Sequence, residues 1–132
     1  MEDKVKNLQD NLKVLRMAAG MSSTDLGRHL GVTRQMINNW ESHRTNMRRM
    51  NYLAISHVFE EIRDQNKENP DSMLNIVYPI IVSSGFTDEY KEYIKKGVLM
   101  YMPAYFSHTA GMEEIYEHFE NYLRQFTGKR FA

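Results

Sequence analysis

Two short amphipathic segments separated by a glycine constrain this chain more than any other feature. The first segment begins with Ser22 and has an acid three positions later, Asp25, which is a variant of the capping box that starts a helix. Gly31 then interrupts the pattern, and Thr33 is a suitable N-cap for a second short helix over residues 34–41. The sequence therefore predicts two short helices joined by a tight turn.

These two predicted helices carry apolar side chains on one face and polar side chains on the other. The positions expected to point into a core are Leu26, Leu30, Val32, Ile37 and Trp40, with Met36 as a further candidate. The positions expected to point outward from the second helix are Arg34, Gln35, Asn38 and Asn39. The major groove of DNA admits one α-helix, and these side chains can hydrogen-bond to base edges. The pattern therefore favours binding to double-stranded DNA.

Apolar residues at helical spacing continue the pattern on both sides of this pair. Before it, residues 4–19 are predicted to form one helix that ends at Gly20, from the apolar stripe Leu8, Leu12, Leu15 and Ala19. After it, another helix is predicted from the spacing of Met50, Leu53, Ala54, Val58 and Ile62. Four helices are thus expected in the first 63 residues.

The polar stretch 64–72, which contains Pro70, is the expected linker. It divides the chain into a DNA-binding domain over residues 1–63 and a helical accessory region over residues 73–132. The accessory region is expected to begin with a buried, kinked helix that contains Pro79 and is capped by Asp71, with a strand as the alternative. Two further helices are predicted, one after the cap Thr87 and one from an amphipathic stripe over residues 112–126.

The charge distribution separates the same two parts of the chain. The formal net charge is zero, but residues 1–63 hold 10 Lys and Arg against 7 Asp and Glu, and residues 64–132 hold 7 against 10. Five arginines and one acid lie between Gly27 and Phe59. A local basic surface is expected of a nucleic-acid-binding domain, although a solvated basic surface would look the same.

Composition and motifs leave little room for catalysis or metal binding. The chain has no cysteine, its five histidines do not form a metal-ligand motif, and it lacks both a phosphate-binding glycine loop and a nucleophile elbow. We therefore expect neither an enzyme nor a cofactor or metal. No apolar run is long enough to span a membrane, and the N-terminus lacks a signal peptide's apolar core, so a cytoplasmic protein with no membrane partner is expected.

The stretch over residues 20–41, GMSSTDLGRHLGVTRQMINNWE, resembles the lambda-repressor/Cro-like (Xre-type) helix-turn-helix family. It shares the apolar residue before the cap, the capping serine, the Leu-small-x-x-Leu-Gly-Val core and the Thr-Arg-Gln-x-Ile-x-x-Trp-Glu recognition helix. With the flanking helices, the resemblance covers about residues 5–63. It implies an all-α domain, and with the helices predicted over residues 73–132 the expected fold is all-α, with a C-terminal helical region that is a candidate for dimerisation.

The resemblance also implies residue roles. Base contacts are expected from Arg34, which suits guanine, from Gln35, which suits adenine, and from Asn38 and Asn39. Phosphate contacts are expected from the residues that flank the two helices, namely Ser23, Thr33, Arg44, Arg48 and Arg49. Ser23 stands where the family usually has a glutamine, and Gly27 stands where it usually has an alanine. Arg16 and Glu41 match a structural salt bridge between the family's first and third helices.

Together these observations predict a transcriptional regulator, most simply a bacterial, phage or mobile-element repressor that occludes a promoter. A homodimer is expected because family operators are commonly two-fold symmetric. The stripe over residues 112–126 could serve that dimer or pack within its own chain. Two alternatives stay open: an antitoxin-like module whose second half binds a partner protein, and a regulator whose aromatic-rich second half binds a small-molecule effector.

Overall fold

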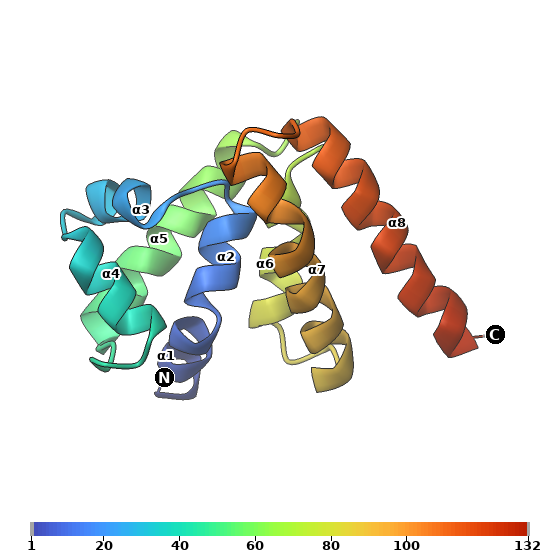
Figure 1. The fold of residues 1–132 in the computed structure, drawn as a ribbon. Helices are drawn as coiled ribbons and strands as arrows, with labels where there is room; N and C mark the ends of the chain where they lie inside the picture. The colour runs from blue at the N-terminus through green and yellow to red at the C-terminus, as the bar shows by residue number, and fades with distance from the viewer. Residues whose placement is uncertain (1, 132) are drawn as a thin grey trace.

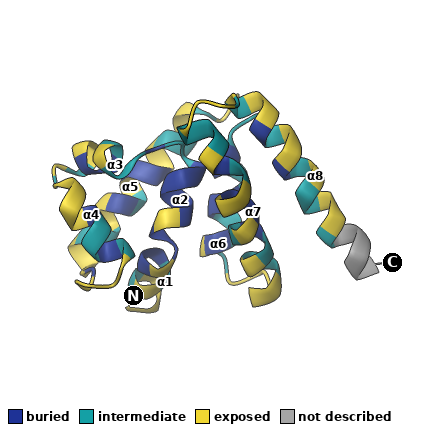
Figure 2. Cartoon of the chain, viewed as in Figure 1, coloured by how far each residue is buried: buried dark blue, intermediate teal, exposed yellow. Residues whose placement is uncertain are grey.

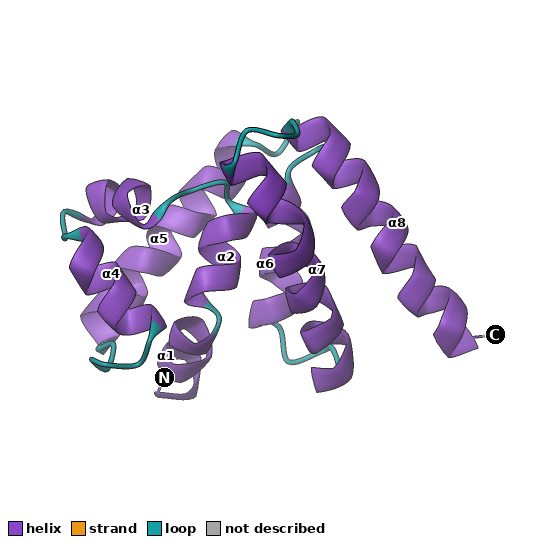
Figure 3. Cartoon of the chain, viewed as in Figure 1, coloured by secondary structure: helices purple, strands orange, loops and turns teal. Residues whose placement is uncertain are grey.

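The structure is a computed structural model that describes residues 2–131, and it describes side chains as far as residue 126. Within the described residues every regular element is a helix, as Figure 1 and Figure 3 show, which confirms the all-α prediction. Met1 and Ala132, the ends of the two expected domains, lie outside the described residues. The helices are α1 (Glu2–Asp10), α2 (Leu12–Ala18), α3 (Ser23–Leu30), α4 (Arg34–Glu41), α5 (Arg49–Gln65), α6 (Met73–Val82), α7 (Asp88–Phe106) and α8 (Met112–Phe131).

The single helix expected over residues 4–19 is two helices, α1 and α2, which meet at Asn11. The Nδ2 atom of Asn11 donates to the backbone oxygen of Asn7 at 2.8 Å and to its Oδ1 at 3.0 Å. Asparagine side chains compete in this way with the helical backbone ladder. The backbone at Asn11 accordingly departs from helical geometry, with φ −113° and ψ 10°. The prediction of one unbroken helix was therefore wrong.

Helices α3 and α4 begin as predicted. The Oγ atom of Ser22 accepts from the backbone N–H of Asp25 at 3.0 Å, and the Asp25 carboxylate accepts from the N–H of Ser22 at 3.0 Å. Thr33 caps α4 by accepting from the N–H of Met36 at 3.1 Å. Gly31 makes the turn between the helices with φ +72°, a conformation that glycine adopts without strain. The predicted capping box and turn are confirmed.

Gly27 marks the closest approach between α3 and this turn. A Cβ atom built on Gly27 would lie 2.7 Å from the backbone oxygen of Val32. No side chain fits there unless the backbone moves, which accounts for glycine at this position despite its low helix propensity.

The apolar faces of α3 and α4 enter the core largely as predicted. Leu26, Ile37 and Trp40 are at most 3% exposed, and Leu30 and Val32 are partly buried against them. Met36, the further candidate, lies on the surface with 37% of its area exposed.

Helix α2 lies between the α3–α4 pair and the accessory helices, as Figure 1 shows, and Figure 2 shows that it is buried along most of its length. It packs against α4 on one side and against α6 and α7 on the other. A helix that packs against partners on two sides needs apolar residues on more than one face, and Lys13 is the one exposed residue of α2. The apolar residues are Leu12, Val14, Leu15, Met17 and Ala18. One continuous core therefore includes residues from both halves of the chain.

The accessory helices follow the predicted order. The segment that contains Pro79 is the helix α6 rather than a strand, although its N-cap is Ser72 and not Asp71. Thr87 caps α7 as predicted, accepting from the N–H of Tyr90 at 3.2 Å. The stripe over residues 112–126 packs within the chain. Ile115 and Phe119 of α8 are buried in the core, Met112 and Leu123 pack against it, and Tyr122 and Phe126 contact rings of α7.

Candidate nucleic-acid interface

The outward face of α4 carries the four residues expected to contact bases. Arg34 and Gln35 are exposed, and Asn38 and Asn39, one helical turn further on, are partly exposed. The opposite face of α4 is anchored in the core by the buried side chains of Ile37 and Trp40. These four polar side chains therefore share one solvent-facing surface on a helix with a fixed apolar side, which we call the α4 surface.

Two hydrogen bonds organise the α4 surface. Gln35 Nε2 donates to Asn39 Oδ1 at 2.9 Å, one turn along the same helix. Ser23 Oγ, at the start of α3, donates to Asn38 Oδ1 at 3.1 Å. Gln35, Asn38 and Asn39 are therefore oriented before any ligand is present, and Asn38 is oriented from a neighbouring helix.

A salt bridge holds α4 against α2, as the resemblance implied. Arg16 Nε and Nη2 donate to the two carboxylate oxygens of Glu41 at 2.7 and 3.0 Å, and Nη1 donates to the backbone oxygen of Met21 at 2.9 Å. Both charged side chains are only 10% exposed. Buried bidentate pairs of this kind fix geometry strongly. The predicted structural pairing of Arg16 with Glu41 is confirmed.

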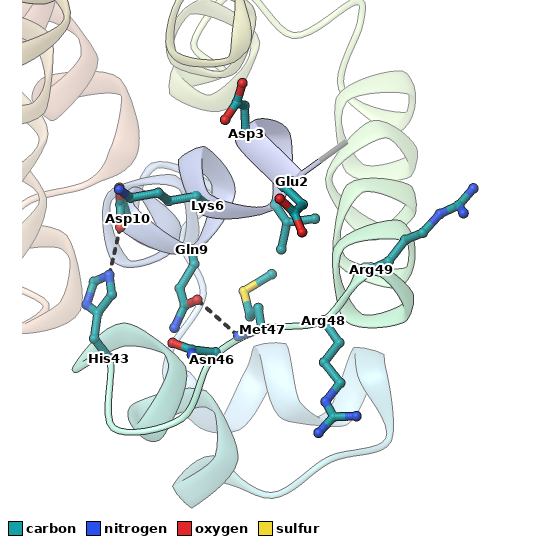
Figure 4. Close-up of a pocket in the computed structure, with 11 residues that line it drawn as sticks. Glu2, Asp3, Lys6, Gln9, Asp10, His43, Asn46, Met47, Arg48 and Arg49 are labelled. Carbon is teal, nitrogen blue, oxygen red and sulfur yellow. Dashed lines mark hydrogen bonds and ion pairs between the residues drawn. The ribbon is translucent and has the colours of Figure 1, made fainter.

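The loop between α4 and α5 carries the arginines expected to contact phosphates. Arg44, Arg48 and Arg49 are all exposed, and Arg48 is the N-cap residue of α5. In Figure 4 the side chains of Arg48 and Arg49 extend away from each other. Thr33 is also exposed, whereas Ser23 is partly buried beside Asn38. The predicted contact residues thus lie on α3, on α4, in the turn between them, in the loop after α4 or at the first residue of α5.

Gln9, a residue that the sequence analysis missed, fixes this loop from α1. Its Nε2 donates to the backbone oxygens of Trp40 and Thr45 at 3.0 and 2.8 Å, and its Oε1 accepts from the N–H of Met47 at 3.0 Å (Figure 4). The side chain is buried, and these bonds supply partners for its amide oxygen and nitrogen. The sequence did indicate that Gln9 could be buried, because Gln9 lies one turn before Leu12 on the inward side of the same apolar stripe.

A second contact holds the same loop beside a pocket. His43 Nε2 lies 2.7 Å from Asp10 Oδ1, and His43 has a left-handed backbone with φ +62°. The pocket between α1 and the loop has a volume of about 730 Å³ and mixed charge, and both arginines at the start of α5 line it. The loop that carries the predicted phosphate contacts is therefore tied to α1 at both Gln9 and Asp10.

One ionisable group in this region has a shifted pKa. Hydrogen bonds from Ser22, chiefly from its backbone N–H, lower the pKa of the Asp25 carboxyl below its ordinary value of 3.8, and the nearby charge of Arg28 acts in the same direction. The negative form of Asp25 therefore persists at the N-terminus of α3, where it also complements the helix dipole.

Part of the chain matches a known protein family. Residues 12–61 match the family model described as Helix-turn-helix. No curated protein and no solved structure matches the chain. The matched segment runs from α2 into α5 and includes every predicted contact residue. It begins after Gln9 and Asp10, which are therefore outside the match.

Two further properties of the described residues concern membranes and metal ions. None of the helices there has both the length and the apolar character needed to cross a membrane. Among the same residues, no three His, Asp or Glu side chains gather closely enough to bind a metal ion together.

Proposed function

We propose that this chain is a sequence-specific transcriptional repressor, because residues 12–61 match the helix-turn-helix family model, and helix-turn-helix proteins of the Xre and lambda-repressor type are DNA-binding regulators. It acts in the cytoplasm on a two-fold symmetric operator, as a homodimer that occludes a promoter. The observation that carries the proposal is the α4 surface, where Arg34, Gln35, Asn38 and Asn39 face solvent from one anchored helix.

The four side chains of the α4 surface are assigned to base edges. A recognition helix presents its N-terminal residues to the major groove, and Arg34 and Gln35 are the first two residues of α4. Arg34 can donate two hydrogen bonds to guanine O6 and N7, and Gln35 can pair with adenine N6 and N7. The anchoring of α4 by Arg16 supports this assignment, because a base contact needs a helix of fixed orientation.

The residues around α4 are assigned to phosphates. Arg44 and Arg48 are exposed on a loop whose backbone is fixed by Gln9, and Arg49 is exposed at the start of α5, so they can engage the DNA backbone from fixed positions. Thr33, which caps α4, joins this set. Contacts of this kind release counterions and make affinity strongly dependent on salt.

The homodimer part of the proposal rests on the half-site argument. One helix-turn-helix reads only a short half-site, so two copies on a symmetric operator supply the affinity and the specificity. The amphipathic stripe of α8 contributes no argument for a dimer, because it packs against α7 in its own chain. Light scattering of the protein with and without operator measures the stoichiometry directly, and one protomer per operator would contradict the dimer.

The base contacts are tested by Arg34→Ala and Gln35→Ala. DNA selected from a random pool by the wild-type protein serves as operator, and binding of each variant is measured on operator and on unrelated DNA. We expect each variant to lose roughly 1–3 kcal/mol of binding free energy on operator and much less on unrelated DNA. Equal weakening on both DNAs would contradict base contact by that residue.

The phosphate contacts are tested by Arg48→Ala, with the exposed Lys96 on α7 as the matched control. We expect Arg48→Ala to weaken binding to every DNA alike and to reduce the slope of log K against log salt by about 1. Lys96→Ala removes the same charge far along the sequence from the α4 surface and should leave the slope unchanged. An unchanged slope in Arg48→Ala would remove that residue from the phosphate set.

A further inference from the structure

The hydrogen bond between Ser23 and Asn38 gives Ser23 a function other than a phosphate contact. Ser23 Oγ donates to Asn38 Oδ1 at 3.1 Å and so joins the start of α3 to the α4 surface. A serine hydroxyl has a single hydrogen to donate. While that hydrogen is bound to Asn38, Ser23 cannot donate it to a DNA phosphate.

The bond also determines which part of the Asn38 amide is presented to solvent. The oxygen and nitrogen of a planar amide point in different directions, so an oxygen directed at Ser23 leaves the NH₂ group for a ligand. Asn38 is partly exposed, and its Nδ2 has no hydrogen bond to the described part of the chain. Asn38 therefore presents two donor hydrogens from its amide.

The amide of Asn39 is also held by its oxygen, in this case by Gln35. Its Oδ1 accepts from Gln35 Nε2 at 2.9 Å, so its NH₂ group is also left for a ligand. Arg34, on the same surface, carries only donors. Along one face of α4 the groups left for a ligand are therefore mostly N–H groups, which match hydrogen-bond acceptors.

Base edges differ in how well they match such a surface. In the major groove, guanine presents two acceptors and thymine presents one, whereas adenine combines an acceptor with a donor and cytosine presents a donor. An asparagine that pairs with adenine through two bonds needs its oxygen as well as its nitrogen. The oxygen of Asn38 is directed at Ser23, so pairing with adenine would require that bond to break or to be shared through the oxygen's second lone pair.

We propose that Ser23 is a positioning residue that sets Asn38 to select a keto base, guanine or thymine, at one position of each half-site. This inference rests on the proposed function, because it names the base class that the same surface recognises. It assigns to Ser23 a role in specificity, acting through Asn38, in place of a contact with the DNA backbone.

The test compares the DNA selected from a random pool by the full-length wild-type protein and by Ser23→Ala, Ser23→Thr, Thr24→Ala and Asn38→Ala. The position whose preference disappears in Asn38→Ala identifies the base that faces this residue. We expect the wild-type protein to select guanine or thymine there. In Ser23→Ala the freed oxygen of Asn38 can accept from adenine, so the preference for a keto base over adenine should fall by about fivefold or more at this position alone.

Two variants serve as controls. Ser23→Thr keeps a hydroxyl at the same position and should retain the wild-type preference. Thr24→Ala removes a hydroxyl from the next, exposed residue of α3 and should also leave the preference unchanged. Circular dichroism of each variant confirms that the helices are intact, which separates a change of specificity from a loss of fold.

Three results would overturn the inference. If Ser23→Ala weakens binding to all DNAs equally and selects the wild-type sequence, Ser23 contacts the backbone and does not position Asn38. If the wild-type protein selects adenine or cytosine at the position that faces Asn38, the proposed orientation of the amide is wrong. If the wild-type protein selects no sequence at all, the proposed function fails, and the inference fails with it.

Discussion

Arg16 uses all three nitrogens of its guanidinium group to join α2, α4 and the backbone before α3. Two of them bind the carboxylate of Glu41, and the third binds the backbone oxygen of Met21. Neither charged side chain is more than 10% exposed, so each charge depends on the other for compensation. At the scale of single residues, this pair sets the orientation of the α4 surface.

Removing one partner of this pair should be costly. We expect Arg16→Ala to lower the free energy of unfolding by roughly 3–5 kcal/mol, because it leaves the Glu41 carboxylate buried without a cation. The matched control is Arg28→Ala, since Arg28 is 76% exposed and lies 3.7 Å from Asp25. This control should cost less than about 1 kcal/mol. Urea unfolding followed by circular dichroism measures both, and equal losses would contradict the structural role of the Arg16–Glu41 pair.

The capping box of α3 should make stability depend on pH in a defined direction. Its hydrogen bonds lower the pKa of Asp25 in the folded state below 3.8, so the folded state favours the carboxylate. The stabilisation is complete above the unfolded pKa and is lost as the pH falls through the lower folded pKa. The stability difference between wild type and Asp25→Asn should therefore be constant near neutral pH and shrink below about pH 4. A difference that stays the same in acid would contradict this origin.

At the scale of elements, α7 and α8 are joined by a reciprocal contact between two tyrosines. The rings of Tyr93 and Tyr122 stack with centroids 4.1 Å apart, and each hydroxyl donates to the other residue's backbone oxygen, at 2.6 and 2.8 Å. Burial raises the pKa of both hydroxyls. The helices approach closely because Gly97 has no side chain, and a Cβ there would lie 2.6 Å from the Tyr122 ring.

A methyl group at Gly97 should therefore separate α7 from α8. We expect Gly97→Ala to destabilise the protein by roughly 1–3 kcal/mol, because rings of both Tyr122 and Phe119 must move to accommodate it. Gly111→Ala is the control, since a Cβ at Gly111 meets nothing within 4 Å. Thermal unfolding compares the two variants, and near-ultraviolet circular dichroism reports the tyrosine stack. Equal stability of the two variants would refute the close contact.

At the scale of the whole molecule, the helix-turn-helix segment and the accessory helices share α2. The core is continuous from α3 and α4 through α2 to α6 and α7. A hydrogen bond from Asn7 Nδ2 to the backbone oxygen of Ile81, at 3.2 Å, adds a polar link between α1 and α6. A shared helix couples the stability of the two parts, because α2 cannot lose its partners on one side without exposing apolar surface.

The chain should consequently unfold in one cooperative transition. Its single tryptophan, Trp40, lies on α4 and reports the helix-turn-helix, whereas far-ultraviolet circular dichroism reports all helices. We expect the two signals to change at the same urea concentration, and we expect Gly97→Ala on α7 to shift the Trp40 transition as well. If Trp40 fluorescence and circular dichroism follow separate transitions, residues 1–63 and 73–132 unfold as independent domains.

Features that depend on residues within one helical turn of each other could largely be predicted from the sequence. The box between Ser22 and Asp25, the caps Thr33 and Thr87 and the turn at Gly31 could be predicted because each bond joins near neighbours, whose spacing the sequence displays. The apolar periodicity of most helices could be predicted for the same reason. The pairing of Arg16 with Glu41 came from the family resemblance, since the two residues are 25 positions apart.

Which polar side chains meet across elements depends instead on how the helices pack, and the sequence does not show this. Gln9 reaches a loop 38 residues away to bind Met47. The packing of the α8 stripe within its own chain and the bond from Ser23 to Asn38 are likewise contacts between different helices, which the sequence does not show. Periodicity shows that a side chain points inward or outward, but the contacts it makes depend on which helix folds against it. The orientation of the α4 surface is therefore a property of the packed molecule.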